Sequence, residues 1–279
     1  MTEEMKKLCK STEQLWSEVM ADYKLLPPIE EQAGYWNAAV DNYETEAETH
    51  RANAEFVFSA IKERGLTDKC SSALEIGGGT GALARLLASD IEKVTCVDIS
   101  DGMLRKLEEK NRLFGVGNIE SVCCNYMDIP EGRTFDLVGA CLVPTTYSAE
   151  GLRRMVSLSK KGGYYMCGCG ALASGTNAYR ELGRILVGDD RPVKQDPIYA
   201  FDLLYSMGLY PKIHYRYTHK TVHWDEETAI KKLSLYFRDA KEKPQGSDEI
   251  IADYVKKHLE DGVLTVRSDG AFAVITWES

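Results

Sequence analysis

The stretch ALEIGGGTGALARLLA, residues 73–88, places four glycines within five positions between two apolar runs. Glycine loses the most conformational freedom on folding, so it is unfavourable inside a strand or a helix. A plain turn between a strand and a helix needs one or two glycines rather than four. The stretch therefore predicts a strand, a glycine-rich turn and a helix, with backbone N–H groups and the helix N-terminus available to a ligand.

Short apolar runs alternate with helix-like segments on both sides of this stretch. The apolar runs cover residues 73–76, 94–99, 119–123, 136–142 and 163–169. The helix-like segments cover residues 82–89, 103–114 and 150–160, and KKGG at 160–163 predicts a tight turn into the fifth strand. This alternation is typical of βαβ units, whose right-handed connections build a doubly wound parallel sheet. We therefore expect an α/β fold.

The segments before and after this region do not show the alternation of strands and helices. Residues 1–65 are mainly helical in pattern and predict an N-terminal cap that belongs to the same domain as residues 66–279. After the fifth strand we expect an insertion at about 171–225, with a strand near its end, and two further helices at about 226–260. The final stretch, GVLTVRSDGAFAVITW, predicts a β-hairpin with its turn at Ser268-Asp269-Gly270.

The composition excludes several classes of function. The chain has 279 residues and a formal net charge of -9, which argues against a surface built to neutralise phosphates. The N-terminus lacks the basic-then-apolar pattern of a signal peptide, and no run approaches the roughly 20 apolar residues of a membrane helix. The eight cysteines show neither a disulfide framework nor zinc-ligand spacing. We expect a cytoplasmic protein with no membrane, nucleic-acid or metal partner, as a monomer or homodimer.

Three interpretations of the glycine stretch compete. One is a turn without a ligand. A second is a dinucleotide site, because Gly77-x-Gly79-x-x-Ala82 satisfies G-x-G-x-x-G/A and Asp98 follows at a suitable distance. The third interpretation, a different nucleoside site, rests on two further features. They are an acid at Glu75 and a further glycine at Gly81, which together give E-x-G-x-G-x-G.

With these features, LEIGGGTGALARLLA followed by VTCVDISDGML resembles the Rossmann-like, class I S-adenosylmethionine-dependent methyltransferases. The resemblance implies a seven-stranded, mostly parallel, doubly wound sheet, with N-terminal helices and a helical insertion after strand five. It also implies a glycine loop that approaches the methionine and ribose portion, and an acid, Asp98, that binds the two ribose hydroxyls. A carboxylate is suited to accept two hydrogen bonds from a vicinal diol. S-adenosylmethionine carries a sulfonium and an ammonium but no phosphate. An acidic loop is therefore better suited to bind S-adenosylmethionine than to bind the pyrophosphate of a dinucleotide.

Further matches extend the resemblance over about residues 73–170. It implies that Ile99 flanks the adenine, that Asn125 accepts from the adenine amino group, with Asp128 as a rival, and that the end of the fourth strand faces the transferred methyl. The cofactor-binding residues expected on this basis are Glu75, Gly77, Gly78, Gly79, Gly81, Asp98, Ile99, Met103, Asn125, Tyr126, Cys141 and Leu142.

The acceptor is less constrained than the donor. The fourth strand ends in ACLVPTTY rather than in the Asn/Asp-Pro-Pro-Tyr-like signature of enzymes that methylate amino groups of nucleic-acid bases or glutamine. No paired-glutamate loop typical of arginine methyltransferases follows it. We therefore expect a small-molecule acceptor, bound by the N-terminal helices and the insertion. The substrate-binding candidates are Tyr35, Trp36, Tyr179 and Tyr199.

Methyl transfer from a sulfonium is an in-line displacement, and it needs a base only if the acceptor must lose a proton. The candidates for such a group are Tyr43, His219 and His223, although an exposed strand face also explains the two histidines. Three alternatives stay open. They are a metalloid or thiol methyltransferase that uses Cys141, Cys167 and Cys169, a non-catalytic protein that binds S-adenosylmethionine, and an NAD-dependent dehydrogenase.

Overall fold

The computed structural model describes residues 2–21, 29–68, 70–169, 177–187, 196–237 and 246–279. The chain divides into two compact units. Unit 1 comprises residues 1–168, 195–215 and 273–279, and unit 2 comprises residues 169–194 and 216–272. The sequence predicted one domain with insertions at 171–225 and 226–260. The division in the structure differs from this, because residues 195–215 group with unit 1.

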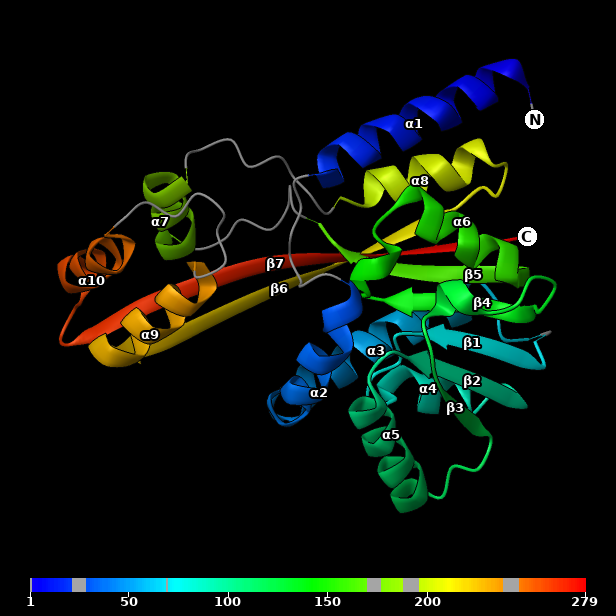
Figure 1. Ribbon diagram of the computed structural model, residues 1–279, viewed down its shortest axis with the longest axis horizontal. Helices are drawn as coiled ribbons and strands as arrows, with labels where there is room; N and C mark the ends of the chain where they lie inside the picture. The colour runs from blue at the N-terminus through cyan, green and yellow to red at the C-terminus, as the bar shows by residue number, and fades with distance from the viewer. Residues whose placement is uncertain (1, 22–28, 69, 170–176, 188–195, 238–245) are drawn as a thin grey trace. The chain divides into compact units, whose positions relative to one another are not determined.

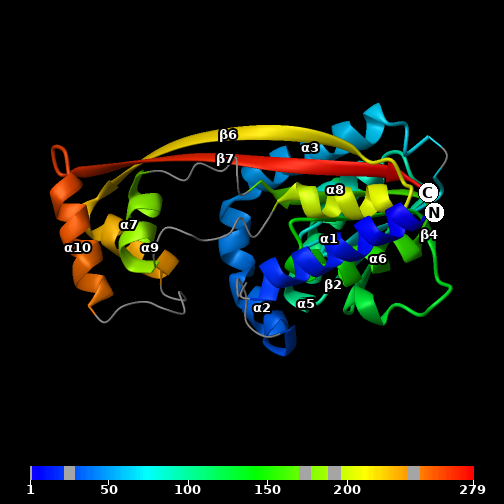
Figure 2. The same cartoon turned by 90° about the horizontal axis from the view of Figure 1, so that it is seen from above.

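The N-terminal part of unit 1 is helical, as the sequence predicted. It contains α1 (Glu3–Ala21), α2 (Ile29–Thr45) and α3 (Ala47–Glu63). The amphipathic pattern of α1 buries Trp16, which stacks on Tyr199 of α8 (Pro197–Ser206) with ring centroids 6.0 Å apart. Helices α1 and α8 lie side by side in both views (Figures 1 and 2).

The sheet contains five parallel strands, of which the first four were predicted within one residue of their observed bounds. They are β1 (Ser72–Ile76), β2 (Lys93–Asp98), β3 (Ile119–Cys123), β4 (Phe135–Cys141) and β5 (Ser159–Gly168). Two long strands, β6 (Lys212–Asp225) and β7 (Val263–Glu278), complete the order β3-β2-β1-β4-β5-β7-β6. The expected seven-stranded, mostly parallel sheet is therefore confirmed. The order reverses between β1 and β4, where open parallel sheets place their ligands.

Helices cover both faces of this sheet within unit 1 (Figure 1). On one face, α6 (Ala149–Leu158) packs with α1 and α8 over a core that includes Leu152, Tyr165 and Trp277. The other face carries α3, α4 (Ala82–Leu87) and α5 (Asp101–Phe114). Helix α5 has a serine N-cap, Ser100, and ends at Gly115 in the left-handed conformation, which are ordinary start and stop signals.

The predicted turn at KKGG is wrong, because β5 already begins at Ser159 and runs through all four residues. The two glycines have a packing role instead. A Cβ on Gly162 would lie 2.4 Å from the carbonyl oxygen of Trp277, and one on Gly163 would lie 2.2 Å from its indole ring. The glycines let the buried Trp277 of β7 approach the strand. This contact joins residues more than a hundred positions apart, and a local pattern carries no sign of it.

The predicted C-terminal hairpin is also wrong, because Val263–Glu278 is one continuous strand. Ser268-Asp269-Gly270 is a turn signal in isolation. In the sheet, however, β7 lies between β5 and β6, so both of its edges are paired and a continuous strand satisfies more backbone groups than a hairpin. A Cβ on Gly270 would lie 2.7 Å from the hydroxyl of Thr218, so this glycine serves a close strand-to-strand approach.

Unit 2 has its own small apolar core. Its helices are α7 (Asn177–Val187), α9 (Glu226–Phe237) and α10 (Ser247–His258), and it also includes the adjoining residues of β6 and β7. The core contains Leu182, Leu233, Ile251 and Val266. Within the described ranges, no helix is both long and apolar enough to cross a membrane.

Candidate functional site

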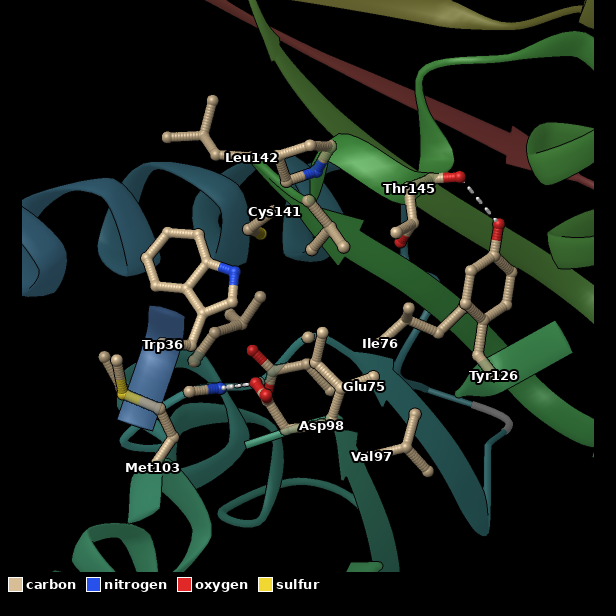
Figure 3. Close-up of a pocket in the computed structure, with 18 of the residues that line it drawn as sticks. Trp36, Glu75, Ile76, Val97, Asp98, Met103, Tyr126, Cys141, Leu142 and Thr145 are labelled. Carbon is tan, nitrogen blue, oxygen red and sulfur yellow. Dashed lines mark hydrogen bonds between the residues drawn. The ribbon is translucent and has the colours of Figure 1, made fainter. Parts of the chain in front are cut away.

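A cavity of about 260 Å³ lies at the carboxyl ends of β1, β2 and β4, within unit 1 (Figure 3). Its walls come from the glycine turn after β1, the ends of β2 and β4, the start of α5, and helices α2 and α3. Of the predicted cofactor-binding residues, those that line it are Glu75, Gly77, Gly78, Gly79, Asp98, Ile99, Met103, Asn125, Tyr126, Cys141 and Leu142. The structure therefore brings together residues from four separate segments of the sequence.

The glycine turn adopts a backbone path that other residues would not tolerate. Gly77 and Gly79 have φ of 63° and 53°, in the left-handed region that glycine adopts without strain. A Cβ on Gly77 would lie 2.5 Å from Val143 Cγ2, and one on Gly78 would lie 1.9 Å from Cys96 Sγ. Gly81 is the N-cap of α4 and packs against α5, outside the cavity wall.

Asp98 is held rigidly at the end of β2. Its Oδ2 accepts a hydrogen bond of 2.9 Å from the backbone N–H of Gly79, and its Oδ1 accepts one of 2.9 Å from the N–H of Ser100. Burial raises the pKa of Asp98, although both backbone hydrogen bonds favour the ionised form. A carboxylate has about four acceptor positions, so each oxygen retains capacity for a second donor.

Glu75 places a buried carboxylate on the same cavity. The side chain is 3% exposed, and its Oε2 has no hydrogen-bond partner. Burial raises its pKa from the ordinary 4.5 to about 8, against the opposing effect of the nearby Arg85. Figure 3 shows the carboxylates of Glu75 and Asp98 directed into the cavity. A buried carboxyl oxygen without a hydrogen-bond partner is costly, so its presence on a cavity wall indicates a ligand that supplies a donor or a positive charge.

Part of the cavity wall is apolar. Val97, Ile99, Met103 and Trp36 line the cavity, and Figure 3 shows the side chains of Trp36 and Met103 on one side of the two carboxylates. Near it, the amide oxygen of Asn125 already accepts from the N–H of Met127 at 3.1 Å, as the N-cap of the short helix Tyr126–Asp128.

That capping bond leaves Asn125 with one lone pair on its amide oxygen and both amide hydrogens. Asp128, the rival for the adenine amino group, is exposed and does not line the cavity. The position of Asn125 is therefore consistent with the predicted role, which stays a prediction.

The wall at the end of β4 carries backbone strain. Leu142 has a φ of 57°, which is uncommon for a residue with a side chain. Its N–H donates to the carbonyl of Met166 at 3.0 Å, so the neighbouring strand holds the strained conformation. The following Pro144–Thr146 turn is fixed by Tyr126, whose hydroxyl donates to the carbonyl of Thr145 at 3.3 Å (Figure 3). Such outliers concentrate at functional sites.

Helix α2 covers the cavity and is tied to α5 at two points. The side-chain oxygen of Asn37 accepts hydrogen bonds from the N–H of Gly102 at 2.9 Å and from the hydroxyl of Ser100 at 2.7 Å. Seven residues further along, Glu44 forms an ion pair of 2.6 Å with Lys110. These contacts hold the aromatic residues of α2 over the glycine turn.

Comparison with known proteins identifies the central region. Residues 73–163 match the family model described as a methyltransferase domain. This region of the chain matches a methyltransferase domain. The matched residues run from the first residues of β1 to the two glycines of β5, and so include the glycine turn, Asp98 and the end of β4.

Solved structures share the fold of this methyltransferase domain. A Bacillus halodurans protein assigned as a methyltransferase is 17% identical, over 79% of this chain and 97% of that one, with a TM-score of 0.51. The YcgJ protein of Bacillus subtilis is 12% identical, over 82% of this chain and 98% of that one, with a TM-score of 0.49. A search of curated protein sequences finds no match.

The methyltransferase domain uses S-adenosylmethionine as its cofactor, and the cavity fits this molecule. The unpartnered oxygen of Glu75 suits a cationic group, Asp98 suits a diol, and the apolar wall suits an adenine ring. The loop backbone packs closely against Val143 and Cys96. A Cβ on Gly77 would collide with Val143, and one on Gly78 would collide with Cys96, so both positions require glycine.

Two of the residues predicted for substrate, both in unit 1, do not line this cavity, and three residues predicted for substrate or catalysis belong to unit 2. Tyr35 is 45% exposed, and Tyr199 packs on Trp16. In unit 2, Tyr179 makes an edge-to-face contact with Trp224, with centroids 6.4 Å apart. The histidines predicted as catalytic candidates, His219 and His223, are exposed on β6. Nδ1 of His223 is 3.1 Å from the hydroxyl oxygen of Thr265. Of this group of candidates, only Trp36 and Tyr43 line the cavity.

Two of the three cysteines of the metalloid alternative, Cys141 and Cys167, lie on different sides of the sheet. Cys141 lines the cavity and lies opposite Met166 in the register of β4 and β5. Because successive side chains of a strand alternate, Cys167 faces the other side of the sheet, where it is buried in the core with Tyr165. Over the described residues, no three His, Cys, Asp or Glu side chains are placed to hold a metal ion.

The sequence interpretation missed cavity residues on α3 and in the turn after β4. His50, Asn53 and Thr145 line the cavity, and none belongs to a recognisable motif. The helical spacing of His50 and Asn53, three residues apart, indicates a shared face. It does not indicate which surface that face covers.

Proposed function

We propose that this protein transfers the methyl group of S-adenosylmethionine to a small-molecule acceptor within the cavity of unit 1. The observation that supports this most strongly is the pairing of two buried or half-buried carboxylates, Glu75 and Asp98, on a cavity wall. No Lys or Arg lines that cavity among the residues that the structure describes. The electrostatics favour a cationic ligand.

Under this proposal, different residues bind the methionine, ribose and adenine portions of the donor. Glu75 faces the positively charged methionine end, and Asp98 accepts from the two ribose hydroxyls. Ile99 and Met103 pack on the adenine, and Asn125 accepts from its amino group. A nicotinamide dinucleotide is a poorer fit, because its pyrophosphate would lie beside Glu75 with no described basic side chain in the cavity to balance it.

We propose a small acceptor because residues of α2 and α3 narrow the space beside the donor. Trp36 and Tyr43 of α2 line the cavity together with the glycine turn, and His50 of α3 stacks on Tyr43. A site lined in this way holds two small reactants in line, which is the main requirement of methyl transfer.

The test uses S-adenosylmethionine with a ¹³C-labelled methyl group and a cell extract separated by ultrafiltration. We expect label transfer to a compound of the low-molecular-weight filtrate, detected by mass spectrometry as a new methylated species. Asp98→Ala serves as the matched control that removes donor binding. Label in the retained protein or nucleic-acid fraction would contradict a small-molecule acceptor. Tight binding of the donor without transfer to either fraction would support the non-catalytic alternative.

A further inference from the structure

His50 is placed to take part in the reaction, although no motif marks it. It lies on α3, is half-buried and lines the cavity. Its ring stacks on Tyr43 with centroids 3.7 Å apart and planes inclined by 7°. It is the one imidazole on the cavity wall among the described residues, and the stack fixes the plane of its ring.

The other titratable groups on the wall are poorly suited to accept a proton. Burial raises the pKa of Tyr43 and Cys141 well above neutrality, so both stay protonated. The hydroxyl of Tyr126 donates to the carbonyl of Thr145. Glu75 and Asp98 are assigned to the donor under the proposed function.

We infer that His50 is the proton acceptor for a methyl acceptor whose reactive group is a weakly acidic O–H or S–H, such as a phenol or a thiol. This inference rests on the proposed function and names the acceptor class at the same site. Imidazole is an effective base near pH 7 because its pKa is close to that pH. A large share of the ring is therefore neutral, and the ring can both accept a proton and release it again.

The surroundings of His50 keep its ring neutral. Burial lowers the pKa of His50, and Lys110 of α5 acts in the same direction. Glu44 and Glu46, together with the backbone carbonyl of Tyr43, act in the opposite direction but do not overcome burial. Lys110 is itself paired with Glu44, so the effects of these two charges on His50 largely balance each other.

The step is balanced in atoms and electrons. The O–H or S–H bond of the acceptor breaks, and the proton forms a new N–H bond on the imidazole. The freed electron pair of the acceptor forms the bond to the methyl carbon, and the sulfur of the donor keeps the pair of the broken S–C bond. The imidazolium then returns its proton to solvent.

The cavity also restricts the charge of the acceptor. With no basic side chain among the described residues of its wall, a phosphate or carboxylate on the acceptor would be left unpaired. An uncharged phenol or thiol avoids this cost. Its ring or chain contacts Trp36 and the apolar wall.

One measurement does not depend on knowing the acceptor. In protein labelled with ¹⁵N-histidine, with S-adenosylhomocysteine bound, we expect the His50 resonances to show a neutral ring at pH 7. They should also shift when S-adenosylhomocysteine is added. A His50 ring that is protonated at pH 7.5 in this complex, or that does not respond to the ligand, would overturn the inference.

Kinetics provide the second test, with a panel of small phenols, thiols and amines and release of S-adenosylhomocysteine as the signal. For a phenol or thiol, His50→Ala and His50→Gln should lower kcat by about 100-fold or more, the usual size of general-base catalysis. The acidic limb of the pH profile should disappear in both variants. Free imidazole should restore part of the rate in His50→Ala. His258→Gln, which removes an imidazole from unit 2, should behave as wild type.

The outcomes separate the two proposals. Failure of the wild-type protein to bind S-adenosylhomocysteine contradicts the proposed function itself. Binding with unchanged kcat in His50→Gln, or turnover of amines alone, overturns only the role of His50. If no member of the panel is methylated, the NMR result decides alone.

Discussion

Replacing Asp98 with alanine is expected to weaken binding of S-adenosylhomocysteine by about 100-fold or more. Two hydrogen bonds from ribose hydroxyls to a carboxylate contribute about 1.5–3 kcal/mol each, so their joint loss exceeds 3 kcal/mol. The substitution also leaves the N–H groups of Gly79 and Ser100 without their side-chain acceptor. Isothermal titration calorimetry measures the change in Kd directly.

Two further variants separate lost binding from lost folding. Asp98→Asn keeps one acceptor oxygen and should show an intermediate Kd with a thermal unfolding temperature closer to wild type. Asp128→Ala removes an exposed acid outside the cavity and should leave Kd unchanged. Unchanged affinity in Asp98→Ala would refute the ribose assignment, and a large loss in Asp128→Ala would show that the rival acid contacts the cofactor.

Replacing Glu75 with glutamine is expected to stabilise the ligand-free protein at pH 8 and to weaken cofactor binding. The folded-state pKa of Glu75, about 8, is above its ordinary 4.5, so the protonated form is the one that the fold favours. Its contribution to stability is therefore complete below about pH 4.5 and is lost as pH rises to about 8. A shift of this size corresponds to at most about 5 kcal/mol of unfolding free energy. Glutamine stays neutral and avoids this loss.

Urea unfolding at several pH values checks this prediction. The difference in unfolding free energy between Glu75→Gln and wild type should be small near pH 5 and should grow steadily towards pH 8. Glu92→Gln, an exposed acid, is the matched control and should show no such trend. A difference that does not vary with pH would show that burial of Glu75 carries no ionisation cost.

The same variant tests the role of Glu75 in binding. If the bound cofactor presents a positive charge to this side chain, the carboxyl group must ionise on binding and release a proton. Wild-type affinity for S-adenosylhomocysteine should therefore rise with pH up to about 8. That dependence should vanish in Glu75→Gln, whose affinity should be at least about 10-fold lower. Equal affinity and equal pH dependence in the two proteins would contradict the assignment.

The sequence predicted, for physical reasons, a set of residues that the structure brings together on one cavity. Glu75, the glycine turn and Asp98 lie at the ends of β1 and β2, and parallel strands bring their carboxyl ends to one edge of the sheet. Cys141 follows from the same rule at the end of β4. Once the alternation of strands and helices was recognised, topology alone placed these residues together.

Other features depend on contacts that no local pattern records. His50 lines the cavity because α3 packs beside α4, and nothing in its helix distinguishes it from a surface histidine. The positive φ of Leu142 depends on the neighbouring Met166 of β5. The sequence Ser268-Asp269-Gly270 favours a turn, but β7 stays continuous there because it pairs with strands on both sides. In each case tertiary structure overrides or supplements local preference.

The central claim is that the glycine turn and its two acids form a site for S-adenosylmethionine and its demethylated product rather than for a dinucleotide. Calorimetric titration of the purified protein with S-adenosylhomocysteine and with NAD, under identical conditions at pH 8, tests it most directly. We expect S-adenosylhomocysteine to bind with a stoichiometry of about one, and NAD to give no saturable heat. Saturable binding of NAD with no binding of S-adenosylhomocysteine would contradict the account.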